Sequence, residues 1–410
     1  MPAAILLAAG LIIFATLPPR TVTMATGAAG GANHELGQHY RDILARSGVR
    51  LRLVNTTGSL DNLARLRDPS SGVQVGFIQG GTTTKQESPQ VESLGTVFFE
   101  PVWLFYRSEI GHDIQAFRGS RVSVGPEGSG GRVLALGILK RLKLDNVIGS
   151  LLSLPPEEAA DKLTAGEIDI AFIVSGWESP VVRRLMEANG IAIASVPRPD
   201  ALAALYPFLN KVVLPAGVAD LAANRPPADT VLLAPKASLA VRGDLHSAIQ
   251  YLLLNAAVEI HSPPGIFQRA GQFPAAESVD LPLSAEAQRF HKGGQPVLQT
   301  YLPFWMAALV ERFLVVFIPA LVLLYPAFAL LPRAYDWLMQ SRILRLYDEM
   351  KVIESDLVSG RETPDAINAK LDRLYQSASE LRLPAKYASM QYTLRSHLDL
   401  VRDRLFAGAK

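Results

Sequence analysis

The order of apolar and polar positions predicts alternating strands and helices in the first two-thirds of the chain. Between residues 20 and 260, short apolar, β-branched runs alternate with segments whose apolar residues share one helix face, such as Leu36, Tyr40, Ile43 and Leu44. The strand-like runs are 20–27, 49–57, 73–80, 120–126, 168–176 and 191–197. This alternation predicts an α/β fold with mostly parallel sheets, in which ligands bind beyond the carboxyl ends of the strands.

Two extended stretches with internal prolines interrupt the alternation. The first, "LGTVFFEPVWLFYR" within 94–120, is too long for one ordinary strand and is interpreted as a crossing between two lobes. The second, near 210–235, is interpreted as the return crossing. The chain is therefore predicted to form a hinged clamp with a cleft between two lobes. Lobe one comprises 20–105 plus 212–300, and lobe two comprises 106–211.

Two further runs are apolar enough to suggest membrane segments. Residues 3–17 fit a signal-peptide core, so 1–19 is assigned either to a signal peptide or to an N-terminal membrane anchor. Residues 313–331 form an uncharged apolar run, which predicts a transmembrane helix over 304–332; a buried core helix is the alternative. The Arg and Lys residues that follow this run place the C-terminal side in the cytoplasm.

The segment 333–410 is polar with helical periodicity. Its first apolar seam is spaced 4, 3, 4, 3, 4: Met339, Ile343, Leu346, Met350, Ile353 and Leu357. Two similar seams follow, one after "SGRETP" and one after Pro384. A small intramolecular helical hairpin or bundle is the favoured interpretation. An oligomerisation or docking module is the alternative.

Composition narrows the possible functions. The chain has 410 residues, enough for two or three domains, and its mean hydropathy of +0.19 is high for a purely soluble protein. The net charge of +2 and the absence of a basic stripe argue against nucleic-acid binding. The chain contains no cysteine, which excludes disulfides and Cys-ligated metals.

The stretch "HELGQH" resembles a zinc-protease helix, but its spacing is wrong. His34 and His39 are five residues apart, which on a regular helix separates their side chains by about 140° around the axis. One metal ion cannot bind both, so a metalloprotease is not expected. The neighbouring "GAAGG" fits neither a dinucleotide fingerprint nor a Walker A loop, and no G-x-S-x-G elbow occurs. We therefore expect no enzyme activity, no metal and no cofactor.

Four strand ends share a different pattern, in which small residues lead directly into a predicted helix. They are "ATGAAGG" (25–31), "NTTGSLDN" (55–62), "GPEGSGG" (125–131) and "VSGWESP" (174–180). The free N–H groups and positive dipole end of a helix N-terminus favour carboxylate or phosphate. Simple N-capping by Ser59, Ser129 or Ser179 is the structural alternative. Glu100 could face the cleft and read an ammonium group, or pair with an arginine such as Arg107.

The same motifs resemble a known family. "VTMATGAAGGANHELGQ", "VNTTGSLDNLARL" followed by "VQVGFIQGG", and "VSVGPEGSGGRVLA" with "DIAFIVSGWESPVVRRL" are similar to the TAXI solute receptors, the TRAP-associated extracytoplasmic immunogenic proteins. The resemblance covers about residues 20–260. It implies a two-lobed periplasmic binding protein, type II-like, that closes on a small carboxylate such as glutamate or a dicarboxylate.

The resemblance also implies positions for the ligand contacts. These are Gly30, Gly31, Asn33, Thr57, Gly58, Ser59, Gln79, Ser129, Gly130, Gly131, Ser175 and Trp177, and His34 at the first helix start could also reach a ligand. The chain departs from the family pattern at Asn33 and His34, where relatives often have tyrosine, and at Gly131, where they have threonine.

These observations lead to one main functional hypothesis and one alternative. The main hypothesis is an extracytoplasmic receptor for a small organic anion that serves the membrane subunits of a TRAP-type transporter. It would be held at the lipid bilayer of the inner membrane, with its binding region in the periplasm and the tail 333–410 in the cytoplasm. The alternative is a membrane-anchored sensor or scaffold that reports ligand occupancy through the tail.

Overall fold

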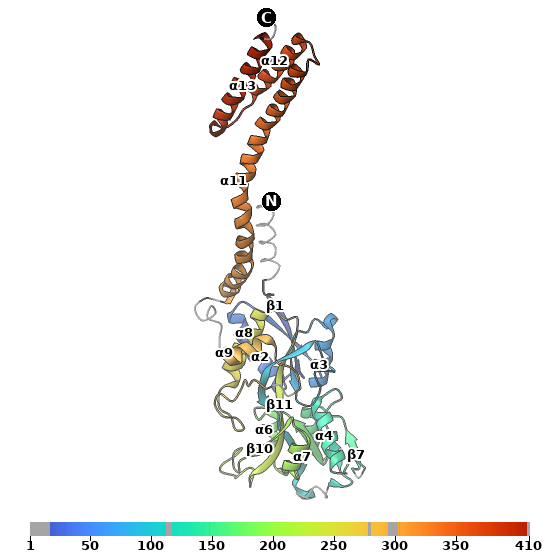
Figure 1. Ribbon diagram of the computed structural model, residues 1–410. Helices are drawn as coiled ribbons and strands as arrows, with labels where there is room; N and C mark the ends of the chain where they lie inside the picture. Colours follow the sequence, from blue (N-terminus) through green and yellow to red (C-terminus); the bar gives the residue numbers. More distant parts are fainter. Residues whose placement is uncertain are drawn as a thin grey trace. The chain divides into compact units, whose positions relative to one another are not determined.

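The computed structural model describes residues 17–111, 117–146, 148–277, 280–293, 302 and 304–407. The chain divides into two compact units, one of residues 16–312 and one that holds residues 313–410. Figure 1 shows both, coloured along the sequence. The first unit contains two sheets, and each is considered below with the helices that cover it.

The first sheet contains six strands, in the order β10-β11-β3-β1-β2, with β4 paired to β11. β1, β2 and β3 are parallel, whereas β11 is antiparallel to β3, β4 and β10. The strands are β1 (Thr21–Gly27), β2 (Arg50–Asn55), β3 (Val75–Gln79), β4 (Val91–Phe99), β10 (Leu209–Leu214) and β11 (Thr230–Arg242). The helices are α2 (Ala32–Arg46), α3 (Ser59–Arg67), α8 (Ser247–His261) and α9 (Ala285–Gly293), with a short 3₁₀ turn η1 (Pro69–Ser71).

Helices cover both faces of this sheet. The apolar stripe of α2, including Tyr40 and Leu44, packs with α8, α9 and one face of β1, β3 and β11 in a single core. α3 covers the other face, where Leu63 and Leu66 pack against β1 and β3. Because both faces are covered, the central strands are apolar at successive positions, as the sequence pattern predicts for buried parallel strands.

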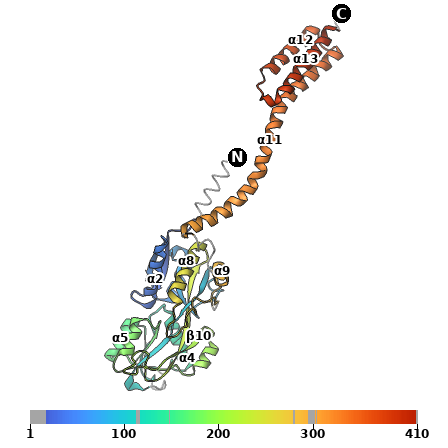
Figure 2. The ribbon, with the colours of Figure 1, turned by 90° about the vertical axis from the view of Figure 1, so that its left-hand side faces the viewer.

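The second sheet contains five strands in the order β7-β6-β8-β5-β9. They are β5 (Val102–Arg107), β6 (Arg121–Ser123), β7 (Ser150–Leu152), β8 (Ile170–Val174) and β9 (Ile191–Ile193). The helices are α4 (Gly130–Arg141), α5 (Pro156–Ala165), α6 (Pro180–Glu187) and α7 (Pro199–Leu205), with a 3₁₀ turn η2 (Ser108–Ile110). α4 and α7 pack on one face and α5 and α6 on the other, and Figure 2 shows α4 and α5 on opposite sides.

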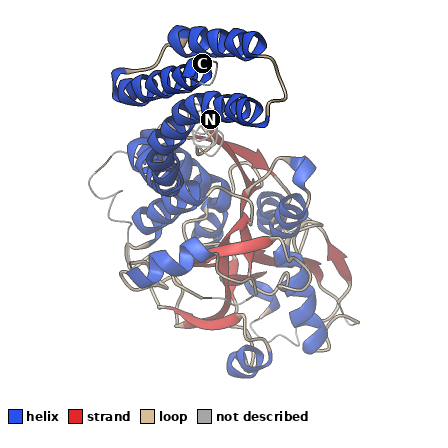
Figure 3. Cartoon of the chain, turned by 45° about the horizontal axis from the view of Figure 1, so that its top comes forward, coloured by secondary structure: helices blue, strands red, loops and turns tan. Residues whose placement is uncertain are grey.

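Two passages of chain connect the sheets, as the proline-punctuated stretches predict. β4 belongs to the first sheet and β5, which begins three residues later, to the second. β11 is 13 residues long and enters both cores: Leu232 and Leu233 pack with the second lobe, whereas Leu239 and Val241 pack with the first. Figure 3 shows the strands of both sheets among their covering helices. The α/β, two-sheet architecture expected from the sequence is confirmed, but the expectation of mostly parallel sheets is wrong, because β11 and β5 pair antiparallel with all their neighbours and make both sheets mixed.

The C-terminal unit consists of helices packed on one another. They are α11 (Phe304–Ser359), whose first residues belong to the first unit, α12 (Pro364–Glu380) and α13 (Ala388–Ala407), with a 3₁₀ turn η4 (Ala385–Tyr387). Seam residues of all three, including Ile343, Leu371 and Leu394, are buried in one core. The seams therefore pack against each other within the chain, as the intramolecular interpretation predicts.

The two membrane predictions receive no support. Among the residues that the structure describes, no helix combines the length and apolar character needed to cross a bilayer, so the transmembrane segment predicted over 304–332 is unsupported. Most of the predicted signal peptide or anchor, residues 1–16, lies outside the described residues.

Candidate functional site

A cleft of about 270 Å³ lies between the two sheets, at the ends of their strands. From the first lobe it is lined by the turns that follow β1, β2 and β3. From the second lobe it is lined by the turns that follow β6, β7 and β8. This is the position at which open α/β sheets bind ligands, because the strands end there and the helix N-termini converge.

Ten of the thirteen candidate residues line this cleft. They are Gly31, Asn33, Thr57, Gly58, Ser59, Gln79, Ser129, Gly130, Gly131 and Ser175. The other three lie elsewhere: Gly30 is exposed in its turn, His34 places its Nδ1 3.3 Å from the Thr26 hydroxyl, and Trp177 lines a second cavity. The structure thus brings most of the candidates together, and ligand contact by any of them stays a prediction.

The turns differ in how many polar groups they leave for a ligand. At α4, the Ser129 hydroxyl accepts a hydrogen bond from the Arg132 amide at 3.2 Å and donates to the Pro126 carbonyl at 2.7 Å, so it serves as the N-cap. At α3, the Ser59 hydroxyl accepts from the Gln79 amide at 2.7 Å and retains its proton for donation. At α2, the N-cap is Gly31, which has no side chain to cap the helix and leaves the first amides facing the cleft.

The two lobes approach each other closely at one end of the cleft, through glycines. A Cβ on Gly58 would lie 3.2 Å from the Ser129 Cα, and a Cβ on Gly128 would lie 2.6 Å from the Thr57 hydroxyl oxygen. Gly130 is similarly close to the side chain of Gln79. At Gly58 the backbone therefore lies directly against the backbone of the other lobe, whereas Gly128 and Gly130 lie against the side chains of Thr57 and Gln79.

Glu100 is the buried acidic group of the cleft. It follows β4, is 6% exposed, and accepts a hydrogen bond from the Asn33 Nδ2 at 3.3 Å. Burial raises the pKa of its carboxyl to about 7, and the bond from Asn33 opposes this shift. Arg107 pairs with Glu109 and Asp169 instead. Of the two sequence-based alternatives for Glu100, the structure therefore shows the one in which it faces the cleft.

The charge of the cleft is negative. Its described lining residues include the acids Glu100 and Glu157 but no lysine or arginine. Any anionic group would accordingly be held by backbone amides, hydroxyls and the amides of Asn33 and Gln79 rather than by a cationic side chain. A second negative charge on the same ligand would have no cationic partner there.

The described part of the chain contains no group of three or more His, Asp or Glu side chains arranged to hold a metal ion. His34 and His39 lie on the regular helix α2 with different surroundings, the first beside Thr26 and the second exposed at the second cavity.

Sequence reasoning missed one wall of the cleft. The segment 154–157 follows β7, includes the first residues of α5, and lines the cavity with two prolines and Glu157. The signal was present, because "LPPEE" is a typical helix start, with proline at the first helical position and acids in the first turn. The strand before it, β7, is at the edge of its sheet and two of its three residues are exposed, so burial does not mark it in the sequence.

The fold and the cleft together define a two-lobed α/β protein with a ligand-sized cavity between its lobes. The chain belongs to the NMT1-like family, which matches residues 24–292. This match includes the strands of both sheets, apart from the first three residues of β1, and every described residue that lines the cleft.

Three solved structures illustrate the comparison with known folds. One is the effector binding domain of QuiR in complex with shikimate, with 10% identity and a TM-score of 0.40 over 59% of this chain and 96% of that chain. Another is a periplasmic substrate-binding protein of an ABC transporter from Coxiella burnetii, with 18% identity and a TM-score of 0.34 over 58% and 91%. The third is an arginine-specific periplasmic binding protein from Salmonella typhimurium, with 13% identity and a TM-score of 0.38 over 60% and 95%. At these levels of similarity, the ligand must be argued from this chain's own residues.

Proposed function

We propose that the protein is an extracytoplasmic solute receptor that binds a small organic carboxylate between its lobes and presents it to a TRAP-type transporter. The observation that carries the proposal is the convergence of strand-end turns from both lobes on one cleft. Ligand contacts with both lobes would stabilise the closed arrangement, and the transporter would recognise closure. The resemblance of the motifs to TAXI receptors supports the transporter assignment.

The position of Glu100 narrows the chemical class of the expected ligand. A carboxylate group fits the amides at the start of α2 and the Ser59 hydroxyl. An ammonium group fits Glu100, because a cation would compensate the burial of its carboxylate. A ligand with one carboxylate and one ammonium group, such as an α-amino acid, therefore suits the cleft better than a dicarboxylate, whose second charge would face Glu100.

Titration calorimetry on the full chain tests this proposal. L-Glutamate, L-alanine and succinate would be titrated at pH 7.5 into the wild type, Glu100→Gln and the control Glu187→Gln, a surface change on α6. We expect an amino acid to bind, and Glu100→Gln to weaken its binding about ten- to hundred-fold, as for loss of a hydrogen bond to a charged group. Glu187→Gln should bind like the wild type.

Three results would contradict the proposal at different levels. Absence of saturable heat with all three compounds, from protein that is folded by circular dichroism, would argue against a carboxylate receptor. Tight succinate binding that Glu100→Gln leaves unchanged would keep the receptor but refute the ammonium role of Glu100. The transporter assignment would be refuted if reconstituted TRAP-type membrane subunits transported the ligand at the same rate with and without the added receptor.

The tail does not strengthen the sensor or scaffold alternative. Its motivating feature was an apolar seam that could dock a partner, and the seam residues Ile343, Met350 and Ile353 are buried against α12 and α13. The proposal therefore assigns ligand binding to the first unit and makes no use of the tail.

A further inference from the structure

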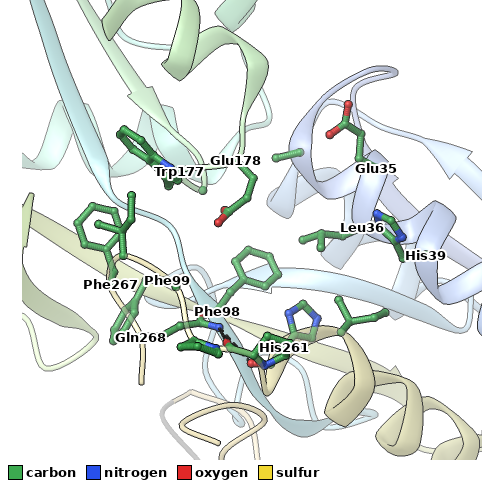
Figure 4. A pocket seen from close by; sticks show the side chains of 17 residues that line it. Glu35, Leu36, His39, Phe98, Phe99, Trp177, Glu178, His261, Phe267 and Gln268 are labelled. Atoms are coloured by element: carbon green, nitrogen blue, oxygen red, sulfur yellow. Dashed lines mark hydrogen bonds between the residues drawn. The ribbon is translucent and has the colours of Figure 1, made fainter. Parts of the chain in front are cut away.

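A second cavity of about 270 Å³ lies beside the cleft. It is bounded by α2 of the first lobe, by residues 176–178 of the second lobe, by Phe98 and Phe99 of β4, and by residues 260–268 at and after the end of α8. Of the described lining residues, Ala32 alone is common to both cavities. The second cavity therefore adjoins the cleft but is lined by a largely different set of residues, to which both lobes contribute. Figure 4 shows its side chains.

Aromatic rings form much of its wall. Phe98, Phe99, Trp177 and Phe267 line it, and Trp177 and Phe267 are held by packing on the buried Trp103 at 6.0 and 5.9 Å between ring centroids. The guanidinium of Arg183 lies 5.9 Å from the Trp177 ring centre, outside the lining, so this ring already attracts a cation. Aromatic faces attract cations through their quadrupoles.

The polar groups of the cavity accept hydrogen bonds. Glu35 comes from the first lobe and Glu178 from the second, and neither has a hydrogen-bond or ion-pair partner among the described residues. The side-chain nitrogen of Gln268 donates hydrogen bonds to the carbonyls of His261 and Pro263, at 3.1 and 2.9 Å. This leaves the side-chain oxygen of Gln268 as a further acceptor. In Figure 4 the Glu178 carboxylate points toward the space over Phe98, whereas the exposed Glu35 lies on the opposite side with its carboxylate directed away from Phe98.

No described lining residue supplies a fixed positive charge. The lining contains neither lysine nor arginine. His261 is neutral, because burial lowers its pKa to about 3, and its Nε2 lies 3.1 Å from the Tyr40 hydroxyl. His39 is exposed on α2 at the margin. At neutral pH the cavity thus combines two carboxylates, an amide oxygen and aromatic faces, a set that is complementary to a cation bearing N–H donors.

We propose that this second cavity binds a small organic cation with N–H donors, an alkylammonium or guanidinium group. Its alkyl part would contact the aromatic rings and its N–H groups would donate to Glu178 and Gln268, with Glu35 adding negative charge at the opposite margin. Because one carboxylate comes from each lobe, the empty cavity sets two like charges across the interface. An occupying cation would neutralise them and favour the arrangement in which the lobes are close.

Calorimetry on the full chain at constant ionic strength tests the proposal with three probes: methylguanidinium, methylammonium and tetramethylammonium chloride. We expect saturable binding of the two probes with N–H groups and weaker binding of tetramethylammonium. Glu178→Gln and Trp177→Leu should each weaken binding at least ten-fold. Glu187→Gln removes the same charge from the same lobe, away from the cavity, and should leave the affinity unchanged. If Trp177→Leu does not fold, Phe267→Leu replaces it.

Several results would overturn the proposal. They are absence of saturation with every probe, equal loss of affinity in Glu187→Gln and Glu178→Gln, and equal affinity for tetramethylammonium and methylammonium. The variant Glu100→Gln distinguishes binding in the second cavity from binding in the cleft, since it should leave the affinity for the probes unchanged. Loss of probe affinity in that variant would place the cation in the cleft and refute a second site, without bearing on whether the cleft binds a carboxylate.

Discussion

The buried carboxyl of Glu100 makes a prediction about stability that needs no ligand. Its pKa is raised from 4.5 to about 7 in the folded protein, so the folded state binds this proton more tightly than the unfolded state. The free energy of unfolding therefore includes a favourable contribution that is complete below pH 4.5 and is lost as the pH rises to 7 and above. The difference between the two pKa values corresponds to about 3 kcal/mol.

Glu100→Gln removes this titration while its amide oxygen can still accept the hydrogen bond from Asn33. We expect the variant to be more stable than the wild type by less than about 1 kcal/mol at pH 5 and by about 3 kcal/mol at pH 8. Urea unfolding at pH 5, 6.5 and 8, followed by tryptophan fluorescence, measures the difference. The control Glu187→Gln makes the same chemical change on the surface of α6 and measures the effect of the substitution itself. A flat difference for Glu100→Gln, or a variant less stable than wild type at pH 8, would refute the reasoning.

Three further changes test other contacts. Gly58 has φ +133 and little space for a Cβ, so Gly58→Ala should lower stability by about 1–3 kcal/mol in calorimetric melts, and more than Gly72→Ala, where φ is +69 and the space is open; equal losses would contradict the close approach of the lobes. Asp169 accepts two hydrogen bonds from the Arg121 side chain, at 2.7 and 3.0 Å, and this lowers its pKa. Asp169→Asn should therefore cost about 1–3 kcal/mol at pH 7, with a difference that shrinks as the pH falls through the carboxyl range; a difference independent of pH would argue against the ion pair. Leu394 is fully buried in the C-terminal unit, so Leu394→Ala should lower the unfolding free energy of that unit by about 2–5 kcal/mol in chemical denaturation and leave ligand binding unchanged; loss of binding would show that the units are coupled.

The main elements of the first unit could be predicted from the sequence because each has a local cause. β3 and β8 are largely apolar at successive positions, and β1 is buried at successive positions over its second half, which is what burial on both faces requires. The candidate residues after these strands could be found for the same reason, since parallel strands bring their carboxyl ends to one edge of a sheet. β7 could not, because two of its three residues are exposed, so burial does not mark it in the sequence, and its place depends on pairing with β6.

Local sequence patterns could not predict the direction in which individual side chains point. Trp177 stands within a candidate ligand turn, yet its ring packs on Trp103 and lines the second cavity, because the packing of two lobes decides where it points. The two alternatives for Glu100, facing the cleft or pairing with Arg107, depend on which side of one extended segment the carboxyl occupies. The sequence does not determine that side. The close approach of Gly58 and Ser129 joins residues 71 positions apart and has no local signal at all.

The route of β11 has a consequence for the order in which the protein matures during its synthesis. β11 lies between β3 and β10 in the first sheet and also pairs with β4. The sheet that starts at residue 21 therefore lacks a central strand until residue 242 has left the ribosome, whereas the strands of the second sheet are complete by residue 193. The lobe that begins first is finished last. The buried strand β3 remains without its neighbour β11 until that point, and a chain truncated before residue 230 would carry an open edge at β3 in its first lobe.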